Sequence, residues 1–338
     1  MRAVLRLAPA VVAALVLAAC GGEDDGQPPT QATETAGGGT ALDFDRVETV
    51  ATGLEVPWAL AFLDERTLLV TERPGRVRVI ADGELRAEPA LELDVIASGE
   101  AGLLGIAAHP SYPRPPHVFL HYTAADGNRI SRFRVADGVR LRDEQVALRG
   151  IPATTVHAGG ALAFGPDGLL YAGTGDAGTP QLAADRTSLA GKVLRLDPDG
   201  AVPEDNPFSS PVFAFGLRNP QGLAWGADDR LYASEHGPSG EAGLCCHDEV
   251  NAIEAGGFYG WPLRAGRTRV AEGTPPAEPV DPLADSGADT TWAPAGVAVD
   301  AAGAGDTSVL VATLRGERLL RFAVGDDGGL GEPRAVLE

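Results

Sequence analysis

A histidine beside two glycines is the first candidate for chemistry. In His157-Ala158-Gly159-Gly160, the glycines leave the imidazole uncrowded and let the backbone approach a ligand closely. An imidazole titrates near neutral pH, so His157 suits a general base that takes a proton from a hydroxyl group. A histidine that only binds a loop carbonyl explains this short segment equally well.

A cationic side chain and two amides gather in residues 216–222, which contain Arg218, Asn219, Pro220 and Gln221. A planar guanidinium group and amides beside a rigid proline suit a carboxylate or a quinone oxygen. A capped turn that carries a surface arginine is the alternative interpretation.

Oxygen ligands are concentrated in a third region. Glu235-His236-Gly237-Pro238 is followed by Asp248-Glu249-Val250-Asn251 and by the glycine-rich residues 256–262, which include Tyr259. Calcium binds several oxygens with tolerant geometry, so these residue types favour calcium. The spacing matches no EF-hand loop, and the prediction therefore depends on residue type alone.

Cys245 and Cys246 adjoin in the sequence and precede His247. The two cysteines can form a vicinal disulfide or stay as thiols. A zinc site is the weaker interpretation, because three consecutive residues seldom all face one ion.

The elements that must position these residues follow a repeated plan, in which a turn of Pro, Asp or Gly joins two apolar strands. Five such hairpins are predicted at residues 60–71, 106–122, 162–174, 223–234 and 297–313. Further strands are expected at 77–80, 130–135, 193–196 and 319–324. No helix of ten or more residues is expected after the N-terminal segment.

Small sheets that cannot bury both faces alone are typical of a β-propeller, an all-β fold whose blades pack around an axis. A β-sandwich or jelly roll is the competing fold. Five repeats are recognisable, so either the ring has five blades or the chain stops before a larger ring closes. Loops at the blade ends converge, which would bring the polar segments together.

Composition supports a folded domain that does not bind nucleic acid. The 338 residues include 44 glycines and 26 prolines, which favour short connections over long helices. The formal net charge is −20, and Lys192 is the single lysine. A nucleic-acid surface needs clustered cations, so this class of partner is excluded.

The N-terminus resembles an export signal. Residues 1–19 carry Arg2 and Arg6 before an apolar run too short to span a bilayer, and Leu-Ala-Ala-Cys20 resembles a bacterial lipoprotein box. Lipidation of Cys20 would anchor the chain at the bacterial cell envelope, on the periplasmic or outer face of the membrane. An ordinary cleaved signal is the alternative. Residues 20–41 are typical of a flexible tether, and residues 42–338 form the predicted propeller domain.

Seven motifs occur in order between Val50 and Phe322. They are residues 53–62 with Trp58, residues 102–110 with His109, His157-Ala-Gly-Gly, residues 191–197 with Lys192, residues 218–224, Glu235-His-Gly-Pro, and Asp248-Glu-Val-Asn with Tyr259-Gly-Trp-Pro. Together they resemble the soluble-type quinoprotein glucose/sorbosone dehydrogenase family, close to its aldose sugar dehydrogenase branch. The resemblance implies a six-bladed propeller that binds pyrroloquinoline quinone and calcium and oxidises aldoses at the anomeric carbon to lactones.

The resemblance assigns roles to individual residues. His157 matches the base that takes the proton from the anomeric hydroxyl while hydride passes to the quinone. Arg218 and Asn219 match a pair that binds the cofactor. Gly237 and Pro238 match residues whose carbonyl groups bind calcium.

The resemblance also implies a further calcium site, at the positions of Glu249 and Tyr259. Two matches depart from the family pattern at cofactor contacts. Glu100 stands where a glutamine is usual, and Arg315 stands where a lysine is common. A carboxylate at position 100 would repel a tricarboxylate quinone unless it were protonated or paired.

Three larger departures remain. Ala161 stands where an arginine is common, and an insertion at residues 241–247 splits the predicted calcium loop. The six-bladed propeller would also lack its last hairpin in this chain.

The favoured function is therefore a membrane-tethered, quinone-dependent aldose dehydrogenase with a respiratory or other electron acceptor. The alternative is a non-catalytic propeller that binds a glycan or a protein partner at the cell surface. A calcium-dependent lactonase is disfavoured, because too few carboxylates would converge on the axis.

Overall fold

The computed structural model describes residues 42–301 and 307–337. Regular structure in these residues is almost entirely β-strand, with one four-residue α-helix, α1 (Gln181–Ala184), and one short 3-10 helix, η1 (Glu241–Gly243). No helix in these two ranges is long and apolar enough to cross a membrane. The predicted signal peptide, the lipidation site Cys20 and the tether lie outside the described residues.

The described residues form five larger antiparallel sheets and one two-stranded ribbon. The first sheet contains β1 (Pro57–Asp64), β2 (Thr67–Glu72), β3 (Arg76–Ala81), β4 (Glu84–Leu85) and β5 (Leu91–Glu92). The second contains β6 (Leu103–Ala108), β7 (His117–Ala124), β8 (Gly127–Ala136) and β9 (Arg140–Ile151). The third contains β10 (Leu162–Phe164), β11 (Leu170–Thr174), β12 (Lys192–Leu196) and β13 (Val212–Phe215).

The remaining strands follow the same plan. The fourth sheet contains β14 (Pro220–Trp225), β15 (Leu231–Glu235), β16 (Glu249–Ile253) and β19 (Ala284–Asp285). The fifth contains β20 (Pro294–Asp300), β21 (Ser308–Thr313), β22 (Arg318–Ala323) and β23 (Arg334–Leu337). The ribbon consists of β17 (Arg264–Ala265) and β18 (Thr268–Arg269).

The five predicted hairpins are confirmed, because each forms the first two strands of one sheet. In the two most similar copies, the register pairs Phe164 with Leu170 and Trp225 with Leu231. The four further strands expected from the sequence correspond to β3, β8, β12 and β22. Alternation of apolar residues and recurrent turn residues were sufficient to locate these elements.

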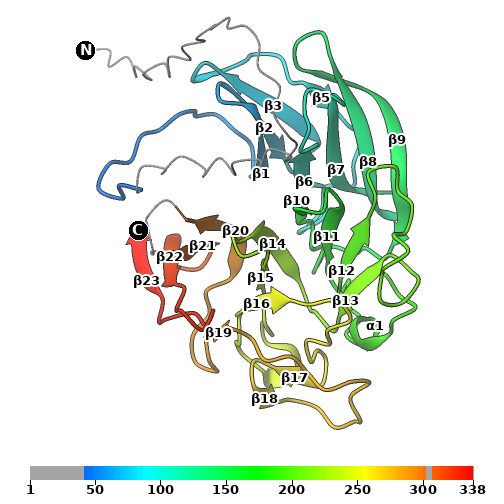
Figure 1. The fold of residues 1–338 in the computed structure, drawn as a ribbon, viewed down its shortest axis with the longest axis vertical. Coiled ribbons are helices and arrows are strands. Elements are labelled where there is room, and N and C mark those ends of the chain that lie inside the picture. Colours follow the sequence, from blue (N-terminus) through cyan, green and yellow to red (C-terminus); the bar gives the residue numbers. More distant parts are fainter. Residues whose placement is uncertain (1–41, 302–306, 338) are drawn as a thin grey trace, which may run out of the picture. The chain divides into compact units, whose positions relative to one another are not determined.

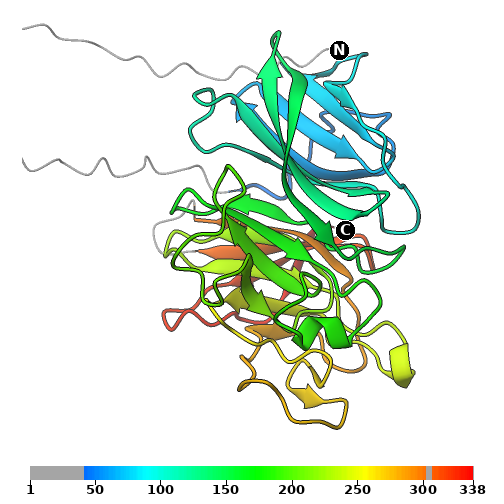
Figure 2. The same ribbon diagram turned by 90° about the vertical axis from the view of Figure 1, so that its right-hand side faces the viewer.

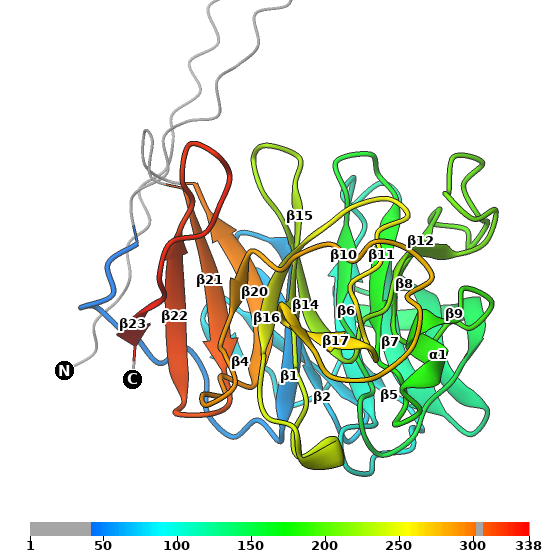
Figure 3. The ribbon, with the colours of Figure 1, turned by 90° about the horizontal axis from the view of Figure 1, so that it is seen from below.

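Successive sheets pack face to face around an axis, in chain order from blue to red (Figure 1). Each pair of neighbouring sheets encloses its own apolar core. Between the fourth and fifth sheets, for example, Tyr232 and Val250 pack with Val311 and Phe322. Figure 2 shows the strands of the first two sheets side by side, and Figure 3 shows β20–β22 beside β14–β16. This is the blade packing of a β-propeller.

The number of blades differs from the expectation. The described residues form five blades, whereas the resemblance implied six with the last hairpin lacking. The fifth blade is complete at four strands, because 334–337 pair with β22 as an outer strand. Among the described residues no apolar core joins the fifth sheet to the first, and the side chains of Leu60 and Phe62 on β1 are 59% and 63% exposed.

Candidate functional site

His157 lies in the loop between β9 and β10, which joins the second blade to the third. Its Nδ1 atom lies 2.6 Å from Oδ1 of Asp176, and its Nε2 atom lies 2.8 Å from Nη2 of Arg218. A guanidinium group can only donate, so Nε2 accepts and Nδ1 carries the proton that is donated to Asp176. This is the tautomer that a base acting through Nε2 requires.

Glycines allow this loop to approach the end of β11. A Cβ atom on Gly159 would lie 2.6 Å from the backbone nitrogen of Gly175, and a Cβ atom on Gly175 would lie 1.8 Å from the carbonyl oxygen of His157. His157 itself has a φ angle of 51°, which is uncommon for a residue with a side chain. Local strain of this kind is frequent at functional sites.

Asp176 directly determines how the imidazole is oriented. Its side chain is fully buried, and its Oδ2 atom accepts a hydrogen bond of 2.8 Å from Nε1 of Trp261. Its Oδ1 atom also accepts a hydrogen bond of 2.8 Å from the backbone of Gly178. With both oxygens held, the carboxylate fixes the position of Nδ1 of His157.

Arg218 lies beside His157 and is 2% exposed. Its Nη1 atom donates to the carbonyl oxygen of His236 at 3.1 Å, and its Nε atom donates to Oε1 of Glu241 at 3.1 Å. The guanidinium carbon lies 5.9 Å from the ring centre of Trp261, within range of a cation–π contact. The guanidinium group of Arg218 is therefore held by His157, His236 and Trp261, and the carboxylate of Glu241 lies against its remaining face.

Asn219 joins His157's loop to Glu100. Its Oδ1 atom accepts a hydrogen bond of 2.9 Å from the backbone of Gly159, and its Nδ2 atom donates to Oε2 of Glu100 at 3.0 Å. The same carboxylate oxygen also accepts a hydrogen bond of 3.3 Å from the backbone of Ala158. Glu100 is thus paired with two neutral donors, which reduces the repulsion that its charge would exert on an anionic ligand.

A pair of buried carboxylates lies next to Arg218. Glu235 at the end of β15 is the register partner of Glu249 at the start of β16, and Nδ2 of Asn251 donates to both, at 3.2 and 2.9 Å. Burial raises the pKa of Glu235 well above its usual value and raises the pKa of Glu249 to about 7. Oδ1 of Asn251 is buried and has no hydrogen-bond partner among the described residues.

A small cavity adjoins this pair. Its volume of about 10 Å³ matches a single water molecule or ion. Glu235, Glu249, Gly237, Pro238 and Tyr259 are among the residues that line it. Two buried carboxylates with raised pKa values beside such a cavity are the donor set that a hard cation prefers.

The predicted calcium loop is held in place by Asp248. Oδ1 of Asp248 accepts a hydrogen bond of 2.9 Å from the backbone of Gly237, and Oδ2 accepts hydrogen bonds from the backbones of Trp292 and Ala293 at 2.6 and 2.9 Å. Asp248 therefore fixes the loop that carries Gly237 and Pro238. Its two oxygens are already used, so it is a supporting residue of this site.

The hydroxyl group of Tyr259 already has two partners. It donates to the carbonyl oxygen of Ala252 at 2.6 Å and accepts from the backbone of Glu254 at 2.8 Å. It is therefore not a free ligand for a cation in the small cavity. Within the described part of the chain, no three His, Cys, Asp or Glu side chains are grouped as a metal site, so a bound cation would need backbone oxygens.

The insertion at 241–247 covers the site. Cys245 and Cys246 form a vicinal disulfide at its base, which resolves the choice between disulfide and thiols. Nδ1 of His247 lies 3.1 Å from the carboxylate of Asp285, so the histidine has a partner other than a metal. At the tip, Oε1 of Glu241 contacts Arg218 and lies 3.4 Å from Nε2 of His157.

Arg315 is the predicted cofactor contact that the structure leaves apart. It is exposed in the turn between β21 and β22, where its backbone nitrogen donates to the carbonyl oxygen of Trp292 at 3.2 Å. No bond among the described residues joins its side chain to His157 or Arg218. The predicted residues that do meet in one cluster are Glu100, His157, Arg218 and Asn219, with Gly237, Pro238, Glu249 and Tyr259 around the neighbouring cavity.

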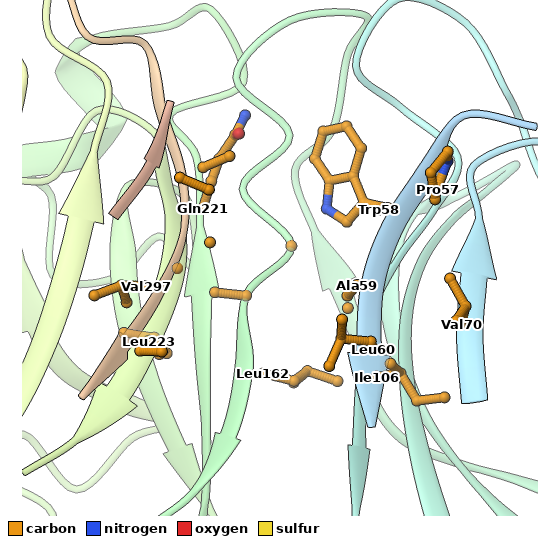
Figure 4. A pocket seen from close by; sticks show the side chains of 18 of the residues that line it. Pro57, Trp58, Ala59, Leu60, Val70, Ile106, Leu162, Gln221, Leu223 and Val297 are labelled. Carbon is orange, nitrogen blue, oxygen red and sulfur yellow. The ribbon is translucent and has the colours of Figure 1, made fainter. Parts of the chain in front are cut away.

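A larger cavity, with a volume of about 610 Å³, is lined in part by Gly160 and Gln221. It lies between β1 and the strands that carry Leu162, Leu223 and Val297, with Trp58 projecting into it (Figure 4). None of its lining residues is charged or a histidine, and Gln221 supplies the amide. Its lining therefore lacks groups that transfer protons, whereas the smaller polar site contains them.

Three residues of the site were not identified from the sequence. Asp176 lies in a Gly-Asp-Ala-Gly segment that resembles a turn. Trp261 belongs to one of the family motifs and Glu241 to the insertion, and neither position indicates a role by itself. Lys192 belongs to one of the family motifs, but it is a structural residue. Its Nζ atom is buried and donates to carbonyl oxygens around α1, including that of Leu182 at 2.8 Å.

Comparison with known proteins gives a matching family model and several similar structures. The family model described as Glucose / Sorbosone dehydrogenase matches residues 54–337. The structure of the PQQ-bound form of aldose sugar dehydrogenase from Streptomyces coelicolor is 41% identical and superposes with a TM-score of 0.74, with 86% of this chain and 83% of that chain covered.

Two curated relatives have lower identity. Aldose sugar dehydrogenase YliI of Escherichia coli is 33% identical, with 64% of this chain and 62% of the relative covered. Quinoprotein glucose dehydrogenase B of Acinetobacter calcoaceticus is 30% identical, with 66% of this chain and 53% of the relative covered. The chain thus spans between about half and two thirds of the length of these relatives.

Proposed function

The chain belongs to the glucose/sorbosone dehydrogenase family, and we propose that it oxidises the anomeric hydroxyl group of an aldose to a lactone with pyrroloquinoline quinone as cofactor. One observation carries the proposal. Nε2 of His157 is the unprotonated ring nitrogen and accepts a hydrogen bond from Arg218, while Asp176 holds the opposite ring nitrogen at 2.6 Å.

The residues around Arg218 fit an anionic quinone. In this structure the carboxylate of Glu241 lies against the guanidinium group, so the site has the geometry and charge to bind a carboxylate. Arg218 and Asn219 would hold oxygens of the cofactor. Asn219 and Ala158 already donate hydrogen bonds to Glu100, so its carboxylate would repel the nearby cofactor less strongly.

Proton transfer is the contribution of His157. The anomeric carbon would release its hydrogen as hydride only as the hydroxyl proton leaves, and Nε2 is the atom that would take this proton. Asp176 then stabilises the imidazolium cation, because its carboxylate faces Nδ1. When bound, the quinone supplies the acceptor for the hydride.

Calcium fits the cavity beside Glu235 and Glu249. A cation there would offset the repulsion between two buried carboxylates. The carbonyl groups of Gly237, Pro238 and Tyr259 would complete the oxygen set. We propose that this cation orders the loop that contains His236, Gly237 and Pro238. The same loop supports Arg218, because the carbonyl oxygen of His236 accepts a hydrogen bond from its guanidinium group.

The cellular setting remains a prediction from the sequence. A chain exported by residues 1–19 and lipidated at Cys20 would act at the bacterial cell envelope. Electrons from the reduced cofactor would pass there to a respiratory or other acceptor.

A dye-coupled assay with glucose and other aldoses, in the presence of the quinone and calcium, tests the proposal. The wild-type protein should turn over, and His157→Ala should lose activity while still binding the quinone. Retained turnover in that variant would remove the proposed base. Absence of any quinone-induced rise in melting temperature would favour the alternative, a propeller that binds a glycan or protein partner.

A further inference from the structure

We infer that Glu241 is an internal competitor for the ligand of Arg218: its carboxylate occupies the place of an anionic ligand group and must leave before that ligand binds. The inference rests on the proposed function only in naming the quinone as that ligand. The wider claim is that Glu241 sets the affinity of this site for carboxylates.

The contacts of Glu241 are those of a bound ligand. Its Oε1 atom accepts from both Nε and Nη2 of Arg218, and it also lies 3.4 Å from Nε2 of His157. A single carboxylate oxygen thus touches the cation and the proposed base together. An incoming carboxylate or quinone oxygen that binds Arg218 would need this same position.

Burial differs sharply between the two partners. The side chain of Arg218 is 3% exposed, whereas that of Glu241 is 37% exposed. Arg218 is also held by His236, and its backbone nitrogen donates to Glu235. Glu241 can therefore move into solvent without disturbing the core, and Arg218 would stay in place with its charge unpaired.

The tip of the insertion, residues 240–244, can move as one piece. Gly240 donates to the carbonyl oxygen of Leu244 at 2.8 Å, and the backbone of Ser239 donates to the Glu241 carboxylate, so the bonds of the tip are largely internal. A Cβ atom on Gly240 or Gly243 would meet no atom within 4 Å, which means that both ends of η1 are unconfined. The disulfide at Cys245 closes the base of this tip.

Local charge explains why a competitor would have a large effect. Arg218 faces Glu241 while Glu100, Glu235 and Glu249 lie nearby, so the charge of one arginine is set against several carboxylates. With Glu241 in place, the cation is neutralised and a free anion meets net negative charge. Removing that one carboxylate leaves the guanidinium charge of Arg218 unpaired and makes the local charge one unit less negative.

Glu241→Gln and Glu241→Ala test the inference, with Glu88→Gln as the matched control. Glu88 also pairs with an arginine, Arg140, at an exposed position away from the site. Quinone binding to the calcium-loaded protein is measured by equilibrium dialysis, without sugar. Both Glu241 variants should bind about tenfold more tightly than wild type, since charge-assisted pairs with arginine are of this strength, and Glu88→Gln should match wild type.

A second probe separates this inference from the proposed function. Benzene-1,3,5-tricarboxylate, in calcium-free buffer, should raise the melting temperature of both Glu241 variants more than that of wild type. If this holds while no variant binds the quinone, Glu241 remains the competitor and the proposed function fails. Equal or weaker binding of the tricarboxylate by both variants would overturn the inference.

Discussion

Asp176 connects two parts of the site that are far apart in the sequence, since one of its oxygens lies 2.6 Å from Nδ1 of His157 and the other lies 2.8 Å from Nε1 of Trp261. The carboxylate thereby holds the imidazole in the tautomer in which Nε2 is unprotonated. An asparagine amide at this position would turn its NH2 group toward one of two neighbours that already donate. The orientation of His157 thus depends on the charge of Asp176.

Asp176→Asn should lower kcat by about 10³-fold, because the wrong tautomer and an unstabilised imidazolium ion both oppose proton transfer. The quinone dissociation constant should stay within about twofold of wild type, since Arg218 and Asn219 are retained. Steady-state kinetics and equilibrium dialysis measure the two effects. Asp126→Asn, which changes an exposed aspartate paired with Arg129, is the control. A kcat close to wild type in Asp176→Asn would show that Asp176 does not orient the base.

The hairpins could be predicted from the sequence because the signal is local. Apolar alternation and a Gly, Pro or Asp turn recur at each hairpin, as in Leu162–Phe164 with Leu170–Thr174. The blade number could not be predicted in this way. It depends on which sheets pack on one another, and the expectation of six came from the resemblance rather than from the residues.

The site was predicted where a residue carries an unusual local pattern. His157 and Arg218 stand beside glycine or proline in loops between blades, and these loops meet. Asp176 was not predicted, although its position carries a signal. It comes just after β11, and Glu235 stands at the end of β15, the matching strand of the next blade. Glu241 could not be assigned, since its contact depends on the path of an insertion. Arg315 was assigned by resemblance, and its side chain is exposed.

Calcium should stabilise the wild-type protein through the Glu235 and Glu249 pair. At a calcium concentration about 100 times the dissociation constant, the gain in unfolding free energy is about 2.7 kcal/mol. Glu249→Gln should lose most of this gain and should be more stable than wild type in EDTA, because a buried charge has been removed. Thermal unfolding with and without calcium measures both effects.

Glu254→Gln serves as the control for the calcium experiment, since Glu254 is exposed and close in sequence. It should respond to calcium as wild type does. An equal response to calcium in Glu249→Gln would place the cation elsewhere.

His121 should make the stability of the fold depend on pH. It lies on β7 with no exposed surface, and burial lowers its pKa from 6.5 to about 4. Because the folded state disfavours the charged form, the unfolded chain binds more protons between these values. The contribution of His121 to the free energy of unfolding is therefore fully present above pH 6.5 and is lost as the pH falls toward 4. Between pH 7 and pH 4.5 this loss is about 2 kcal/mol.

His121→Leu should remove that part of the pH dependence, because leucine cannot be protonated. Urea unfolding of wild type and variant at pH 7 and pH 4.5 measures the difference, and other titrating groups cancel in the comparison. His109→Leu should change the slope less, since the His109 imidazole is only partly buried. The prediction fails if wild type and His121→Leu lose the same unfolding free energy between pH 7 and pH 4.5. That result would show that His121 is already protonated in the folded state, or that water reaches its site.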